Sequence, residues 1–126
     1  MSLIVRDAGF DDISWSQCMV FRYEGPEGRR PSDLASSLQM SKQAVNDCLR
    51  HFEDHGYLTR APSPEDGRAR IIRLTARGEA LQEVIRAAGR RVEQEWKEAI
   101  GETDWSTFTR VLDRLVGMAL DADEQR

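Results

Sequence analysis

Apolar residues follow a helical spacing along most of this chain. They are dense enough from residue 14 to 22, Trp15 included, to predict a largely buried helix, and they form one-sided stripes over 31–38 and 42–54. Two longer amphipathic stretches follow, one after Thr75 and one after Thr103, and each threonine is expected to cap its helix. Residues 121–126 are expected to be a frayed tail. The pattern predicts a mainly helical protein.

The two helices in the middle of the chain are predicted to form a helix-turn-helix. Pro31 suits the first position of the earlier helix, and Ser41 suits the N-cap of the later one. Gly56 is expected to end the later helix. The tight connection at residues 39–40 favours the motif. The buried stripe of the second helix consists of Val45, Cys48, Leu49 and Phe52, and its opposite face carries Lys42, Gln43, Asn46 and Arg50.

A basic hairpin is predicted directly after this motif. Residues 57–58 and 71–74 are short strand candidates, and the Pro- and Gly-rich segment 62–67 between them forms the tip. Arg68 and Arg70 alternate along the second strand and are expected to share one face. Asp66 is expected to form an ion pair with one of them. The fold class is therefore α+β, mainly α with a small β-hairpin.

Composition and charge narrow the class of protein. The 126 residues suffice for one core, and no apolar run has the length of a membrane span. We therefore expect a cytoplasmic protein without a membrane partner. The net charge is −4, yet residues 29–73 carry eight Lys and Arg against six Asp and Glu, whereas the rest has ten against sixteen. The small positive excess lies on the segment suspected of contacting DNA.

The polar face of the second helix has the chemistry of a base-reading surface. Amides bond adenine and arginine bonds guanine in the major groove, although a solvated polar face has the same composition. Arg68 suits insertion into a narrow minor groove. His51 and His55 have a spacing that can bind zinc, but no third ligand stands out, and Cys18 lies among apolar residues. No catalytic constellation and no cofactor are predicted, so the protein is not expected to be an enzyme.

An aromatic cluster lies on the last two helices. Trp96, Trp105 and Phe108 either pack between these helices or form part of a dimer interface. A two-fold dimer would place two recognition helices one turn apart on a palindromic site.

The run from Arg30 through the LTARG sequence, and above all PEDGRARIIRLTARG, closely resembles the winged helix-turn-helix of MarR-family transcriptional regulators. The resemblance implies that Arg68 enters the minor groove and that Asp66 and Arg70 brace the wing. It also implies DNA contacts from the recognition helix, through Ser41, Lys42, Gln43, Asn46 and Arg50. Asp47 puts a negative charge on the recognition helix. It would repel DNA phosphates unless its carboxylate meets a cytosine amino group or an internal arginine.

These observations predict a single domain, 1–126, in which 13–75 binds double-stranded DNA and 1–12 and 76–120 form dimerisation segments. The expected function is that of a homodimeric repressor, released from a palindromic operator by a small aromatic ligand, as the resemblance implies. Two alternatives stay open: a winged helix that binds a protein partner, and a redox- or metal-responsive regulator.

Overall fold

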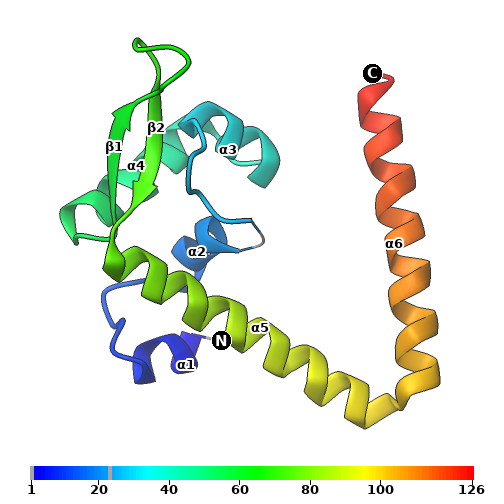
Figure 1. Cartoon of the computed structure of the whole chain (residues 1–126). Helices are drawn as coiled ribbons and strands as arrows, with labels where there is room; N and C mark the ends of the chain where they lie inside the picture. Colours follow the sequence, from blue (N-terminus) through cyan, green and yellow to red (C-terminus); the bar gives the residue numbers. More distant parts are fainter. Residues whose placement is uncertain (1, 23) are drawn as a thin grey trace. The chain divides into compact units, whose positions relative to one another are not determined.

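The computed structural model describes residues 2–22 and 24–126, whose regular secondary structure is helical apart from one antiparallel hairpin (Figure 1). Two compact units are present, Met1–Gly89 and Arg90–Arg126, and helix α5 runs through the boundary between them. None of the described helices is long and apolar enough to cross a membrane. The elements are α1 (Ser2–Asp7), α2 (Trp15–Cys18), the 3-10 helix η1 (Met19–Phe21), α3 (Pro31–Leu38), α4 (Lys42–Asp54), β1 (Leu58–Pro62), β2 (Arg70–Leu74), α5 (Ala76–Ile100) and α6 (Glu102–Glu124).

The hydrophobic core lies in the first unit. Phe52 of α4 is fully buried and makes edge-on contacts with Phe21 and Tyr57, at centroid distances of 4.8 and 5.8 Å. Leu81 and Ile85, from the first half of α5, belong to the same cluster. The core therefore joins the helix-turn-helix to the base of the hairpin and to the start of α5.

The hairpin has a defined register and a covered edge. Strand β1 pairs with β2 from Leu58 opposite Leu74 to Pro62 opposite Arg70. On the other side of β2, the Gly28 N–H donates to the Ile72 carbonyl at 2.7 Å, and the Ile72 N–H donates to the Arg29 carbonyl at 2.9 Å. The chain before α3 thus fixes the hairpin from its second edge.

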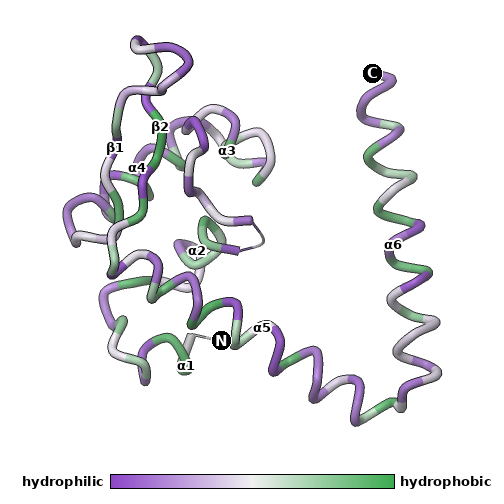
Figure 2. The backbone as a smooth tube through the Cα atoms, in the orientation of Figure 1, coloured by the Kyte–Doolittle hydropathy of each residue, from purple (hydrophilic) through white to green (hydrophobic). Residues whose placement is uncertain are grey.

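The second unit consists of the end of α5 and the whole of α6, joined at Gly101. A φ of 89° at Gly101 favours glycine there because a Cβ would be strained. Trp96 contacts Trp105, and Trp105 contacts Phe108, at centroid distances of 6.4 and 5.8 Å. Figure 2 shows hydrophobic and hydrophilic residues alternating along α6. The aromatic packing expected inside the chain is present, but Trp96 remains 55% exposed.

Four expectations from the sequence differ from the structure. The predicted helix over 14–22 breaks into α2 and η1, and Arg22 is extended because the chain turns there toward the Gly-Pro segment. Trp15 is 47% exposed rather than buried. Thr103 does not cap α6, because Gly101 takes the N-cap and the helix begins at Glu102. The tail is helical to Glu124, since alanine and glutamate favour helix and no Gly or Pro interrupts it.

Candidate nucleic-acid interface

Helix α4 is positioned by its cap and by its buried stripe. The Ser41 hydroxyl accepts a hydrogen bond from the Ala44 N–H at 3.1 Å, as the sequence predicted. Val45, Leu49 and Phe52 are fully buried, whereas Cys48 is only partly so. Burial of this stripe leaves the opposite face in solvent. The predicted DNA-contact residues on that face are exposed, except Asn46, which is half-buried: Ser41, Lys42, Gln43, Asn46 and Arg50.

The acidic residue of this face is partly neutralised within the helix. Asp47 Oδ1 accepts a hydrogen bond from the Gln43 amide at 3.1 Å and lies 3.8 Å from Arg50 Nη1. Of the two roles open to Asp47, the structure shows the contact with an internal arginine. The exposed pair is weak, since water screens both charges.

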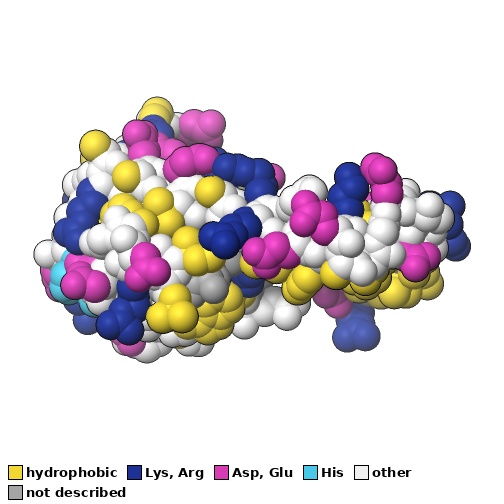
Figure 3. Space-filling model, turned by 90° about the horizontal axis from the view of Figure 1, so that it is seen from below, with side chains coloured by type: hydrophobic (Ala, Val, Ile, Leu, Met, Phe, Trp, Pro, Cys, Tyr) yellow, Lys and Arg dark blue, Asp and Glu magenta, His cyan; other side chains and the backbone are white. Residues whose placement is uncertain are grey.

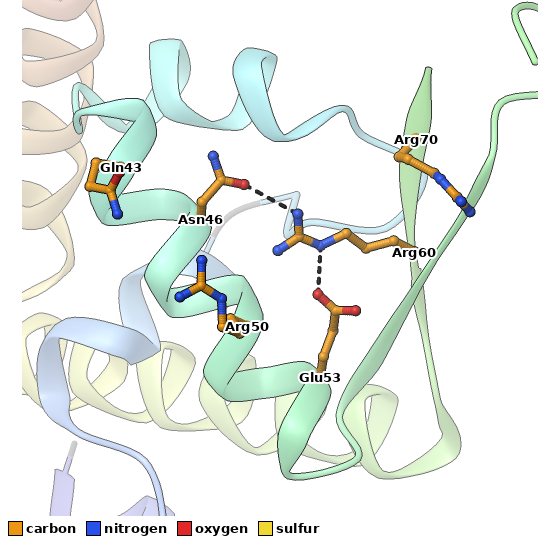
Figure 4. Close-up of a pocket in the computed structure, with 6 residues that line it drawn as sticks. All are labelled: Gln43, Asn46, Arg50, Glu53, Arg60 and Arg70. Carbon is orange, nitrogen blue, oxygen red and sulfur yellow. Dashed lines mark hydrogen bonds and ion pairs between the residues drawn. The ribbon is translucent and has the colours of Figure 1, made fainter. Parts of the chain in front are cut away.

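A groove lies between α4 and the hairpin, with a volume of about 590 Å³ (Figure 4). It is lined from α4 by Gln43, Asn46, Arg50 and Glu53, and from the hairpin by Arg60 and Arg70. Three arginines against one glutamate make its lining net positive. Such a groove suits a polyanion better than a neutral ligand.

Arg60 is a residue of this groove that the sequence analysis did not single out. Its Nη1 donates to Asn46 Oδ1 at 3.2 Å, and its Nε lies 2.6 Å from Glu53 Oε1. The Nε contact is an ion pair rather than an aligned hydrogen bond. One sequence signal was available: Arg60 stands two residues after buried Leu58, so both share a strand face that points at α4.

The wing tip is held by Asp66. Its carboxylate accepts from the backbone N–H of Arg68 at 3.1 Å, and its carbonyl accepts from that of Ala69 at 3.0 Å. The predicted ion pair of Asp66 with Arg68 or Arg70 does not occur in the described part of the chain. Arg68 lies in the turn and not on β2, so the expectation that it shares a strand face with Arg70 was wrong. Arg68 is exposed at the tip, while Arg70 lines the groove.

The base of the hairpin is fastened by a polar cluster around Asp12. The Tyr57 hydroxyl donates to Asp12 Oδ1, and Arg77 Nη2 lies 3.0 Å from Asp12 Oδ2. The Arg77 guanidinium also stacks over the Tyr57 ring, 4.3 Å from its centroid. Partial burial acts to raise the pKa of Asp12, but the Tyr57 hydrogen bond and the Arg77 charge outweigh it and lower that pKa. The cluster joins the N-terminal segment, the residue just before β1, and α5.

The surroundings of the histidines and cysteines favour a structural role over metal binding or redox sensing. His51 Nε2 lies 2.7 Å from the Asp12 carbonyl oxygen, and His55 Nδ1 lies 2.8 Å from the His51 carbonyl oxygen. No group of three metal-ligating side chains occurs among the described residues. Burial raises the pKa of the Cys18 thiol, and burial together with Asp47 raises that of Cys48. A raised pKa disfavours the reactive thiolate, which argues against a redox sensor.

Comparisons with known proteins agree with this geometry. Residues 9–69 match the model of the MarR family. HTH-type transcriptional repressor Rv2887 of Mycobacterium tuberculosis is 38% identical over 79 residues, which are 60% of this chain and 56% of that protein. FabT of Streptococcus pneumoniae, solved in complex with DNA, is 20% identical with a TM-score of 0.80 over 95% of this chain and 85% of its own. MarR is 24% identical with a TM-score of 0.77, over 98% of this chain and 84% of its own.

These matches identify the fold of the protein and the family that it resembles. The solved structures show the fold, that of a winged helix-turn-helix protein, with α4 as the second helix of the helix-turn-helix and the β1–β2 hairpin as wing. Over residues 9–69 the chain is similar to the MarR family. It spans just over half the length of the curated relatives that it matches.

Proposed function

We propose that the protein is a transcriptional repressor that binds double-stranded DNA through α4 and the wing. The observation that carries this proposal is the basic groove in which the polar face of α4 meets Arg60 and Arg70 of the hairpin. A helix of this kind fits a major groove, and its amide and guanidinium groups match base edges. The repressor function is supported by the 38% identity to Rv2887, whose name describes a transcriptional repressor.

The wing supplies a second contact in this proposal. Arg68 is exposed at the tip, and its backbone is held by Asp66, so its side chain can enter a minor groove beside the recognition helix. Lys42 and Arg70 also line a smaller hollow of about 320 Å³ with Arg30 at the start of α3. This places further positive charge where phosphates on either side of the groove would lie.

The DNA-binding part is tested by selecting genomic fragments with the purified protein and then titrating salt. Arg68→Ala should weaken binding to all selected sequences and reduce the slope of log K against log salt by about one. Arg91→Ala is the matched control, because Arg91 is also an exposed arginine and lies on α5, outside the helix-turn-helix and the wing. Failure of the wild type to select any fragment at low salt would refute DNA binding. An unchanged slope in Arg68→Ala would refute the wing contact alone.

The repressor is further proposed to be a homodimer joined through its last helices. No residue of α6 is buried within the described chain, although the helix carries a continuous apolar face. Figure 3 shows hydrophobic side chains exposed along the second unit. Exposed apolar surface of this extent marks an interface. The large exposed residues of this face are Phe108, Val111, Leu112, Leu115 and Met118.

The dimer is tested by light scattering on Leu115→Glu. A buried charge at the centre of the apolar face should convert the dimer into monomer, and Ser106→Glu should not. Ser106 is the matched control because it lies nine residues, or two and a half turns, from Leu115, on the opposite side of α6. A monomeric wild type, or a dimer that survives Leu115→Glu, would contradict this interface. Two recognition helices in one dimer would read a palindromic operator.

Release by a small aromatic ligand is the last part of the proposal, and it rests on the family resemblance. Trp96 and Trp105 line an apolar hollow of about 230 Å³ where the end of α5 meets the start of α6. Their fluorescence therefore provides a readout for a panel of aromatic acids and phenols. A ligand should both change this fluorescence and release the selected DNA. A panel in which no compound does both would count against ligand control.

A further inference from the structure

The amide of Asn46 is held at both ends in the free protein. Its Nδ2 donates to the Lys42 carbonyl at 2.9 Å, and its Oδ1 accepts from Arg60 Nη1 at 3.2 Å. Figure 4 shows the Asn46 oxygen directed at the guanidinium of Arg60, which reaches α4 from β1 across the groove. A residue of the hairpin therefore contacts a candidate base-reading residue of the helix.

The contact fixes which way the amide points. A flipped amide would place Nδ2 against the guanidinium, so that two donors would face each other, and would turn Oδ1 toward the Lys42 carbonyl, a second acceptor. Both hydrogen bonds would then be lost. The observed orientation leaves one Nδ2 proton and one Oδ1 lone pair of Asn46 unused.

Glu53 fixes the guanidinium in turn. The Arg60 side chain is only 25% exposed, and its Nε lies 2.6 Å from the Glu53 carboxylate. The positive charge of Arg60 is thus balanced within the groove wall. Arg50, on the same groove, differs because its side chain is 67% exposed and its contact with Asp47 is a weak one at 3.8 Å. Arg50 suits a phosphate, whereas Arg60 suits a neighbouring side chain.

We propose that Arg60 is a positioning residue for base recognition, which orients the Asn46 amide toward the edge of an adenine. Adenine presents an N7 acceptor and an N6 amino donor in the major groove, and these match the unused proton and lone pair of Asn46. Arg60 itself contacts no base. This inference rests on the proposed DNA-binding function, and it adds the base that Asn46 recognises and the residue that makes the recognition selective.

The test is a charge-neutral double variant, Arg60→Met with Glu53→Gln. Selected operators with each base pair varied in turn should show one adenine per half-site that the wild type prefers about tenfold or more and that Asn46→Ala no longer prefers. In the double variant this preference should fall below about threefold, while the salt slope stays that of the wild type because no net charge is removed. Arg91→Met with Glu95→Gln removes an exposed ion pair of α5 and should leave the preference unchanged.

Two results on DNA would overturn the inference. If the double variant kept the adenine preference, Arg60 would not position Asn46. If it weakened binding to all sequences and reduced the salt slope by about one, Arg60 would be a phosphate contact. Adding Asn46→Ala to the double variant should cause no further loss at the adenine, because both changes remove the same interaction. A further loss at that pair would mean that Asn46 still recognises the adenine without Arg60, which would contradict the inference.

A measurement on the free protein separates this inference from the proposed function. The two side-chain amide protons of Asn46 should give distinct, shifted NMR signals in the wild type and signals near those of a free amide in the double variant. Unchanged signals would refute the hold of Arg60 on Asn46 without reference to DNA. If the double variant failed to fold, Arg60→Lys would replace it: the ammonium keeps the charge and lacks the guanidinium geometry, so the preference should fall at an unchanged salt slope. A wild type that selects no DNA would refute the proposed function instead.

Discussion

Replacing Gly78 with alanine should destabilise the protein, although the same replacement at Gly89 should stabilise it. Both glycines lie inside α5, where alanine is favoured over glycine by about 0.5–1 kcal/mol. They differ in their surroundings. A Cβ on Gly78 would lie 2.0 Å from the Tyr57 carbonyl oxygen, whereas a Cβ on Gly89 would meet nothing within 4 Å.

The clash at Gly78 is with backbone that has little freedom to move. The Tyr57 carbonyl accepts a hydrogen bond from the Thr75 N–H at 3.1 Å, and the Tyr57 side chain is held by Asp12. Relief of the clash would therefore move the base of the hairpin and strain this hydrogen bond, which is worth about 1 kcal/mol. Overpacking adds about 1–3 kcal/mol. After the gain in helix propensity, Gly78→Ala should cost about 1–3 kcal/mol.

Urea unfolding followed by circular dichroism measures the difference. The three proteins should be compared at one protein concentration, because the proposed dimerisation would make stability concentration-dependent. Gly89→Ala should raise the urea midpoint and Gly78→Ala should lower it, without a change in slope. If Gly78→Ala were as stable as Gly89→Ala, the close approach of α5 to the hairpin base would be wrong. The position of the wing relative to α4 would then lose its explanation.

Three further outcomes are expected. Because the folded pKa of Asp12 is lowered, its stabilising contribution is full above the unfolded value of about 3.9 and is lost as the pH falls through the folded value. Asp12→Asn should thus cost about 1–2 kcal/mol at pH 7, with partly exposed Arg77 adding little, and the deficit should vanish on acid titration monitored by fluorescence. Phe52→Ala should cost about 3–5 kcal/mol in urea unfolding, and a loss below 1 kcal/mol would contradict its place in the core. Ser41→Ala should cost about 1 kcal/mol through the lost cap, whereas an unchanged midpoint would contradict the Ala44 hydrogen bond.

Local signals in the sequence sufficed for much of the fold. Helix α4 was predicted with its N-cap at Ser41 and its buried stripe, because capping and helical periodicity depend on neighbouring residues alone. The turn at Asp66 and the paired strands were predicted for the same reason. Among the predictions that failed, those for Thr103, the tail and the strand face of Arg68 concern places where competing local choices differ by little free energy. Gly101 rather than Thr103 is the N-cap of α6. Arg68 lies in the turn, two residues before β2 begins at Arg70.

For the candidate interface too, local sequence patterns predicted some features and only the tertiary structure revealed the others. The sequence by itself determined the helix-turn-helix, the basic hairpin and the similarity to the MarR family over residues 9–69, since all three depend on residue types at fixed short spacings. Only the tertiary structure decided that Arg60 contacts Asn46 and Glu53, and that Tyr57 and Arg77 meet Asp12. These contacts join residues 7 to 65 positions apart. Their geometry depends on how the core orients the hairpin against α4 and α5, which no local pattern specifies.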